Sequence, residues 1–200
     1  IALAIASANQ IKYVNEIIIV DDCSTDNTEL IIKDIRDNCR KIKYYRNSVN
    51  QGSGLTFLNG LEKVKNSYVI MLNSDDFFIP KAIEKLFEYT IKNDLDLGYG
   101  KMSIKKNSGI HKYVHPGYKN KSYVDNRNEL QDLLIFDMYI PSFGAVINYD
   151  KIKKFYNKKY YESLNYNFGK SFKAHDYDLF LNLAKKKKRM GFLNETVCVW

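Results

Sequence analysis

Two pairs of adjacent aspartates are the residues of this sequence whose type and placement best suit chemistry. Asp21-Asp22 directly follow the apolar run 17–20, and Asp75-Asp76 come shortly after the apolar run 68–72. Adjacent carboxylates repel one another, so a fold that keeps them together usually offers a bound cation or hydrogen bonds to a polar ligand. Aspartates at strand ends also cap helices, so one pair alone leaves a structural role equally open, whereas two pairs favour a site.

The apolar runs before these pairs have the character of buried β-strands. Both are short and contain β-branched residues, a pattern typical of central strands in a parallel sheet that is covered on both faces. Ligands of open α/β sheets bind just beyond the carboxyl ends of such strands. The sequence therefore predicts that both aspartate pairs lie at one edge of a parallel sheet, in a ligand-binding site.

Further helices and strands are expected around these runs in the first 95 residues. Capping residues at 24–28 precede a helical pattern, and Pro80 stands where a helix can begin without losing a hydrogen bond. The predicted elements are a helix at 29–35, a strand at 42–45, a turn-rich loop at 47–54, a helix at 55–64 and a helix at 81–92. This alternation predicts a doubly wound parallel sheet.

The second half of the chain has a less regular pattern. The predicted elements are a hairpin of strands 97–104 and 109–114, an aromatic and basic loop at 113–125, a strand at 143–147, a short helix at 151–155 and an amphipathic helix at 176–187. No internal repeat or low-complexity linker divides the sequence. The whole chain is therefore expected to form a single domain.

The first residues, 1–8, are apolar, and we interpret them as a first β-strand because no basic leader precedes them as in a signal peptide. A strand that ends near Ser7 and another that begins near Glu16 leave too little chain for a parallel crossover. Either the two strands are not parallel neighbours, or residues are missing between Gln10 and Lys12. Together with the absent initiating Met, this spacing suggests part of a longer chain.

Composition narrows the class of protein. An apolar fraction of 45% and a charged fraction of 27% are ordinary for a soluble globular domain, and no apolar stretch approaches the roughly 20 residues that span a bilayer. Three cysteines without metal-like spacing fit a reducing cytoplasm. Much of the net charge of +8 lies in clusters such as 185–189 at a predicted helix end, so we expect no nucleic-acid partner, while contact with a membrane surface or an anionic substrate stays open.

Four segments, taken in order and spacing, resemble glycosyltransferase family 2. They are the Asp-Asp-Cys-Ser-Thr-Asp segment with its preceding strand at 16–28, Asn-Gln-Gly at 50–52, Leu-Asn-Gly at 58–60, and the second acidic strand end at 68–76. Residues 174–179 are similar to the Glu-Asp helix start of that family. The resemblance implies a GT-A fold, an α/β fold with a Rossmann-like, mostly parallel central sheet flanked by helices. Residues 1–95 would be the half that binds a nucleotide-sugar, and residues 96–200 a smaller, mixed acceptor half.

The resemblance also implies a divalent metal site. Asp75 and Asp76 would hold Mn²⁺ or Mg²⁺ and the ribose-phosphate end of the donor, because these cations prefer oxygen ligands and neutralise the departing diphosphate. Asn73 stands at the first position of the usual Asp-x-Asp motif. Its amide could still bind a ribose hydroxyl but brings no negative charge.

Nucleotide contacts follow from the same resemblance. Asp21 and Asp22 correspond to acids that bind the base or the ribose. Ser7 and Asn9 stand where the family often has Thr-Tyr-Asn. Gly52 would let the backbone approach the nucleotide, or is simply a turn glycine.

Asp176 is the candidate general base, since an acid at this helix start accepts the proton of the attacking hydroxyl in inverting members. The alternative is that Asp176 only caps its helix. His175 replaces the usual Glu and is expected either on the acceptor side or as an exposed residue at the helix start.

The sequence thus predicts a metal-dependent, inverting glycosyltransferase that moves a sugar from a nucleotide-diphosphate donor, expected to be a UDP-sugar, to a glycan or lipid-linked acceptor. We expect it in the cytoplasm, at the inner face of the membrane if it associates peripherally. The alternatives are a nucleotide-sugar or glycan-binding module that has lost catalysis, as Asn73 and His175 suggest, and a receiver-like signalling domain. The donor sugar, the acceptor and the oligomeric state stay open.

Overall fold

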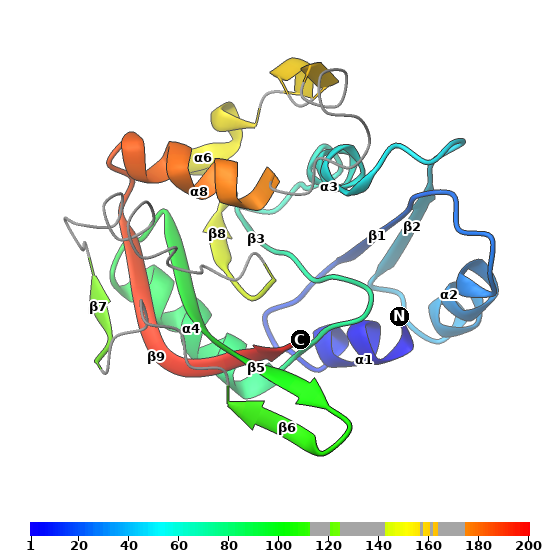
Figure 1. Cartoon of the computed structure of the whole chain (residues 1–200), viewed down its shortest axis with the longest axis horizontal. Coiled ribbons are helices and arrows are strands. Elements are labelled where there is room, and N and C mark those ends of the chain that lie inside the picture. Colours follow the sequence, from blue (N-terminus) through cyan, green and yellow to red (C-terminus); the bar gives the residue numbers. More distant parts are fainter. Residues whose placement is uncertain (113–120, 125–142, 157, 161, 164–174) are drawn as a thin grey trace.

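The structure, a computed structural model, describes residues 1–112, 121–124, 143–156, 158–160, 162–163 and 175–200, with the backbone alone at 175–177. Its elements in chain order are α1 (Ala2–Asn9), β1 (Ile17–Asp21), α2 (Thr28–Asp37), β2 (Ile42–Arg46), α3 (Ser53–Leu61), β3 (Tyr68–Ile70), β4 (Phe77–Phe78), α4 (Pro80–Lys92), β5 (Leu97–Lys106), β6 (Gly109–Lys112), β7 (Tyr123–Val124), β8 (Val146–Asn148), α6 (Tyr149–Ile152), the 3₁₀ helix η1 (Lys153–Phe155), α8 (His175–Lys185) and β9 (Met190–Val199) (Figure 1).

The described strands form two sheets. β1 and β2 pair in parallel as a two-stranded sheet. The larger sheet has the order β3-β8-β5-β9-β4, with β6 paired to β5 and β7 to β9. Within it β5 and β9 are parallel and the other named pairs are antiparallel, so the sheet is mixed.

The two halves of the chain share the larger sheet. β3 and β4 come from the first half, yet they pair with β8 and β9 from the second. Separation of the halves would therefore break strand pairs at two places. A functional division at residue 95 stays a prediction.

Helices cover both faces of the larger sheet. On one face α8 packs its buried Phe180 and Leu183 against Leu97 and Tyr99 of β5. On the other face α4 lies so close to β5 that a Cβ on Gly98 would meet the Thr90 hydroxyl oxygen at 2.1 Å. Glycine at this position is therefore what allows helix and sheet to approach.

The start of the chain is a helix, so the prediction of a first β-strand over residues 1–8 is wrong. Four alanines in α1 favour helix, and its apolar residues Ala4, Ile5 and Ala8 are buried. The Ser7 hydroxyl donates to the Ala4 carbonyl at 2.8 Å and accepts from the Phe78 N–H at 3.0 Å. With a helix here, the segment before β1 is an ordinary helix–strand connection, and the spacing requires no missing residues.

Most other predicted elements are confirmed. The helices at 29–35, 55–64, 81–92 and 176–187 correspond to α2, α3, α4 and α8, and the strand at 42–45 corresponds to β2. The hairpin is β5 with β6, and the short helix at 151–155 is α6 followed by η1. The strand predicted at 143–147 is β8, shifted toward Asn148. Most of the loop at 113–125 lies outside the described residues.

Two expectations about the apolar runs are corrected. β3 is antiparallel to its neighbour β8, where a parallel sheet was predicted. Residues 17–20 and 68–72 are only partly buried, although both runs were expected to be covered on both faces. Among the described residues, no helix is long and apolar enough to cross a membrane.

Candidate functional site

A large cavity is lined by residues along β1, β3 and α3. Its volume is about 1080 Å³, and most of its lining is apolar. Asn15, Glu16, Asn66 and Ser67 line it before β1 and β3. The polar residues that line it from the first turn of α3 and from the segment after β3 are Ser53, Thr56, Asn73, Ser74 and Asp75. We call these five residues the polar mouth. They come from the first turn of α3 and from the segment after β3. Of the two aspartate pairs that were expected to share a site, Asp75 alone lines this cavity.

Asp21 ends β1 with its carboxylate buried and fully engaged. One oxygen accepts from the Ser24 N–H at 2.8 Å, and the other accepts from the Tyr44 hydroxyl at 2.7 Å. Burial alone would raise the pKa of Asp21, but these hydrogen bonds and the nearby Arg46 charge lower it overall. Burial and the bond to Asp21 raise the pKa of Tyr44 to about 12. Asp21 therefore fastens the turn after β1 to β2.

Asp22 holds the loop that leads into α3. Its Oδ1 accepts from the Asn47 amide at 2.9 Å and from the Gln51 N–H at 2.8 Å, and its Oδ2 accepts from the Gly52 N–H at 2.8 Å. Burial would raise the pKa of Asp22, but the hydrogen bonds together lower it. Neither Asp21 nor Asp22 lines the cavity. Contact between this pair and a nucleotide stays a prediction.

Gly52 has a backbone conformation that favours glycine, in addition to its hydrogen bond to Asp22. Its φ of 86° lies in the left-handed region that favours glycine, and it immediately precedes α3. The Asn59 amide on α3 donates to Asn47 at 3.2 Å and to Gln51 at 3.1 Å. This amide network fixes the first turn of α3, and Asn47 is a member that the sequence did not single out. Its only sequence signal is its position in a turn-rich loop.

Asp76 and Asn73 form a contact beneath the polar mouth. Asp76 is 1% exposed, and its Oδ2 accepts from the Asn73 amide at 2.7 Å. Its Oδ1 has no hydrogen-bond partner among the described residues. Burial, followed by the neighbouring Asp75 charge, raises the pKa of Asp76. An aspartate in place of Asn73 would face this buried carboxylate with a second negative charge, so the amide has a structural reason to be there.

Asp75 is the accessible acid of the second pair. It is exposed and lines the cavity, whereas Asp76 does not. An exposed carboxylate beside a buried carboxylate with a free oxygen is a donor set of hard oxygens, which fits Mg²⁺ or Mn²⁺ with ligand and water oxygens completing the shell. Within the described residues, no group of three or more His, Cys, Asp or Glu could hold a metal on its own. Any cation here would therefore depend on a ligand's oxygens.

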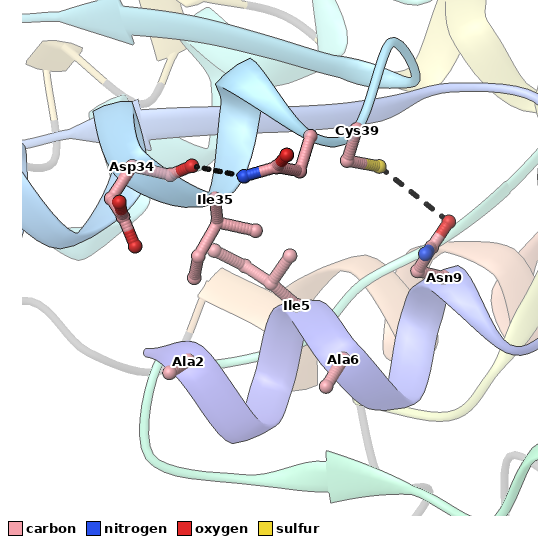
Figure 2. Close-up of a pocket in the computed structure, with 8 residues that line it drawn as sticks. Ala2, Ile5, Ala6, Asn9, Asp34, Ile35 and Cys39 are labelled. Atoms are coloured by element: carbon pink, nitrogen blue, oxygen red, sulfur yellow. Dashed lines mark hydrogen bonds between the residues drawn. The ribbon is translucent and has the colours of Figure 1, made fainter.

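Ser7 and Asn9 lie on α1, where a strand was expected. Both hydrogen bonds of the Ser7 hydroxyl are made inside the fold. The Asn9 Oδ1 accepts from the thiol of Cys39, two residues past the end of α2, at 3.6 Å beside a separate hollow of about 470 Å³ (Figure 2). Neither residue lines the large cavity, and their contact with a nucleotide stays a prediction.

The acceptor-side residues are only partly described. α8 begins at His175, which agrees with a helix start at this point. The side chains of His175 and Asp176 lie outside the described residues, so their roles stay predictions.

Comparison with known proteins finds relatives in sequence. A Haemophilus influenzae protein named as an uncharacterised glycosyltransferase is 35% identical over 85 residues, which cover 42% of this chain and 34% of the relative. The poly(ribitol-phosphate) β-N-acetylglucosaminyltransferase TarP of Staphylococcus aureus is 32% identical over 142 residues, covering 69% of this chain and 42% of TarP.

Solved structures of S. aureus TarS share the fold. TarS in complex with UDP superposes with a TM-score of 0.75 at 16% identity, covering 100% of this chain and 56% of that one. TarS with UDP-GlcNAc gives a TM-score of 0.72 at 15% identity, covering 98% of this chain and 53% of that one. These matches confirm the predicted α/β fold of GT-A type.

The chain spans 34% of the H. influenzae relative, 42% of TarP and 56% of the TarS chain solved with UDP. The family described as "Glycosyl transferase family 2" matches residues 1–170. Since that match extends over most of the sequence and includes every segment around the polar mouth, the protein belongs to glycosyl transferase family 2.

Proposed function

We propose that the protein transfers a sugar from a UDP-sugar to a glycan or lipid-linked acceptor, with the donor diphosphate bound at the polar mouth. The observation that carries this proposal is the exposed Asp75, which lines the large cavity from the segment after β3. Ligands of α/β folds bind at such strand ends. UDP and UDP-GlcNAc in the TarS complexes support the choice of nucleotide.

Asp75 and Asp76 would hold Mn²⁺ or Mg²⁺ in this proposal. When bound, the cation would neutralise the charge that develops on the leaving diphosphate. Asn73 donates to Asp76 and so orients the buried carboxylate. Asp75 would supply the exposed oxygen, and the free Oδ1 of Asp76 would be the second protein donor.

The start of α3 would support the donor from the opposite side of the cavity. Asp22 fixes the Gly52 N–H and thereby the first turn, from which Ser53 and Thr56 reach the cavity. Their hydroxyls can donate to phosphate or ribose oxygens, and a helix N-terminus favours negative charge. In this arrangement Asp22 acts as a positioning residue.

Inversion at the sugar carbon would need a base near the acceptor, and Asp176 at the start of α8 is our candidate. It would accept the proton of the attacking hydroxyl while the carbon–oxygen bond to the diphosphate breaks. The acceptor could be lipid-linked, since the Escherichia coli relative WfgD, 29% identical over 118 residues, is named for α-D-GlcNAc-diphosphoundecaprenol. That choice would place the enzyme in the cytoplasm at the inner membrane face, and the basic run at 185–189 would suit an anionic surface.

The test is release of UDP from a panel of UDP-sugars by the protein expressed from its full gene, with and without Mn²⁺. The variants are Asp75→Asn, and Asp34→Asn as a control for an exposed aspartate on α2. We expect metal-dependent turnover that Asp75→Asn lowers at least about 100-fold and that Asp34→Asn leaves unchanged. Turnover undiminished in EDTA would refute the metal role. Tight UDP-sugar binding without turnover on any acceptor would favour the binding-module alternative, which the neutral Asn73 motivates.

A further inference from the structure

The hairpin of β5 and β6 leaves the larger sheet at the same end as Asp75. Phe77 of β4 pairs with Val199 of β9. Val199 also pairs with Ser103 of β5, which pairs in turn with Lys112 of β6. Because β4 is antiparallel to β9 and β5 is parallel to it, the residues before Phe77 and those after Ser103 lie beyond this row on the same side. The former include Asp75, and the latter form the hairpin.

Trp200 connects the hairpin to the wall of the large cavity. Its N–H donates to the Ser103 carbonyl at 2.8 Å, and its carbonyl accepts from the Lys105 N–H at 2.6 Å. Trp200 also lines the cavity, as Asp75 does. Figure 1 shows the hairpin in green, extending beyond the body of the fold. A projecting element thus adjoins the cavity that the proposed donor site occupies.

The hairpin is basic and contains no acidic residue. Residues 97–112 include one histidine, no Asp or Glu, and the four lysines Lys101, Lys105, Lys106 and Lys112. In the part of the chain that the structure describes, no carboxylate forms an ion pair with these lysines. Burial, followed by the Lys112 charge, lowers the pKa of Lys101, and Glu195 opposes this shift. The described residues therefore leave the positive charge of the hairpin largely unneutralised.

An exposed isoleucine accompanies the lysines. Ile110 is 59% exposed, and every residue of β6 is exposed. Ile110 pairs with Lys105, and Lys112 follows two residues later on β6, so these three side chains share one face of the hairpin. At a bilayer surface, apolar side chains enter the boundary between headgroups and acyl chains, while lysines attract anionic lipids. The apolar residue favours a bilayer over a soluble polyanion as the partner.

Protection of a sheet edge does not account for this composition. Lysines on edge strands discourage pairing with another chain, and Lys112 on β6 has that effect. β5 is paired on both sides at Lys105, whose N–H is bonded to Trp200 and whose partner on β6 is Ile110. Lys105 therefore guards no edge, and an exposed isoleucine on an edge strand works against such protection.

We propose that the β5–β6 hairpin docks the protein on an anionic lipid bilayer. Lys105, Lys106 and Lys112 would meet the lipid phosphates, and Ile110 would enter the boundary between headgroups and acyl chains. The end of the sheet that carries Asp75 would then face the membrane. This orientation would present the donor site to a lipid-linked acceptor, a consequence that rests on the proposed function, whereas the docking itself does not.

The basic run at 185–189 lies at the opposite end of the sheet and provides a matched control. It directly precedes Met190 of β9, which pairs with Leu97 at the start of β5. Lys105 is eight residues further along β5, which corresponds to about 26 Å. Residues 185–187 are exposed, as the hairpin lysines Lys105 and Lys106 are. Removal of charge at the two ends therefore separates docking through the hairpin from a general effect of net charge.

The test is co-sedimentation of the protein expressed from its full gene with vesicles of phosphatidylglycerol and phosphatidylcholine, and with vesicles of phosphatidylcholine alone. We expect binding to the anionic vesicles that weakens as salt is raised. Lys105→Gln with Lys106→Gln should weaken this binding about 30-fold, which corresponds to about 1 kcal/mol for each lysine. Lys186→Gln with Lys187→Gln removes the same charge and should change the binding less than about threefold.

The apolar contact has its own pair of variants. Ile110→Ser should weaken vesicle binding about fivefold, because part of the side chain would leave water in the bound state. Leu30→Ser on α2, where the leucine is 66% exposed, should leave binding unchanged. In the unmodified protein, anionic vesicles should slow amide hydrogen exchange at residues 105–112 and leave residues 185–189 unaffected.

Several results would overturn the proposal. They are equal binding to both kinds of vesicle, undiminished binding of the hairpin variants, and loss of binding only in the Lys186 and Lys187 variant. Binding to soluble polyphosphate but not to vesicles, lost in the hairpin variant, would also overturn it, because the hairpin would then serve a polymeric anion.

UDP release measured without vesicles separates this proposal from the proposed function. The hairpin variants should release UDP at the rate of the unmodified protein. Turnover without vesicle binding would overturn the docking alone. Vesicle binding without turnover would count against the proposed function alone.

Discussion

Replacement of Asp22 should destabilise the protein measurably, because its carboxylate holds the loop that leads into α3. Asp22→Asn keeps the shape of the side chain but puts an amide group where one oxygen was. Of the three hydrogen bonds that the carboxylate accepts, from Asn47, Gln51 and Gly52, at least one is lost and a donor then faces a donor.

The expected loss is about 2 kcal/mol. A hydrogen bond to a charged group contributes about 1.5–3 kcal/mol, and the partly exposed position lets water replace some of it. Asp22→Ala, which removes all three acceptors, should cost about 3 kcal/mol because such losses are not additive. Urea unfolding followed by circular dichroism gives both free energies of unfolding. Asp34→Asn, at an exposed position on α2, is the control and should leave the free energy of unfolding unchanged.

The pH dependence gives a second, independent readout. The pKa of Asp22 is lowered in the folded protein, although burial opposes the hydrogen bonds that lower it. A carboxylate with a depressed folded pKa contributes fully above its unfolded pKa of about 3.9, and the contribution is lost as pH falls through the folded pKa. The stability difference between wild type and Asp22→Asn should therefore be constant from pH 7 to about 5 and shrink below pH 4. A stability difference between wild type and Asp22→Asn under about 0.5 kcal/mol at pH 7, or one that does not change with pH, would refute the role of Asp22 in holding the loop before α3.

Two further substitutions test other parts of the structure. Asn73→Asp puts an acceptor in place of the donor that lies 2.7 Å from Asp76, so thermal unfolding should show a loss of about 2 kcal/mol, partly restored by Mn²⁺; unchanged stability would contradict the contact. Gly98→Ala forces a Cβ to within 2.1 Å of the Thr90 hydroxyl oxygen and should cost about 2 kcal/mol, whereas Gly98→Ala combined with Thr90→Ala should recover part of that loss. Equal stability of the single and double variants would show that the contact between position 98 and Thr90 does not cause the loss.

The sequence predicted those elements that have a strong local signal. α2 and α4 have helical periodicity, and Pro80 begins α4 as expected. The resemblance to the family rested on four ordered segments, and one of them, 68–76, contains Asn73, Ser74 and Asp75 of the polar mouth. Local patterning and motif order were therefore sufficient for the fold class, while the roles of the site residues stay predictions.

The first helix was missed because its pattern is ambiguous. An apolar run of eight residues fits a strand or a buried helix equally well, and the alanine content of α1 was the signal that could have decided it. The assignments of Ser7 and Asn9 rested on the resemblance to the family, and the structure places both residues on α1.

The roles of individual carboxylates needed contacts that no pattern contains. Sequence spacing treats Asp75 and Asp76 alike, yet one is exposed at the cavity and the other is 1% exposed beneath it. Likewise Asp21 and Asp22 are bound by donors from residues 44 to 52, which are distant in sequence. Burial and long-range hydrogen bonds set these differences, and they follow from tertiary packing.

The most direct test of the central claim is calorimetric titration of UDP into the protein expressed from its full gene, with Mn²⁺ present and after its removal by EDTA. If the polar mouth binds the donor diphosphate, UDP should bind with one site in Mn²⁺, and Asp75→Asn should weaken binding at least about tenfold while Asp34→Asn has no effect. Equal UDP affinity in wild type and Asp75→Asn, with and without the metal, would contradict the account.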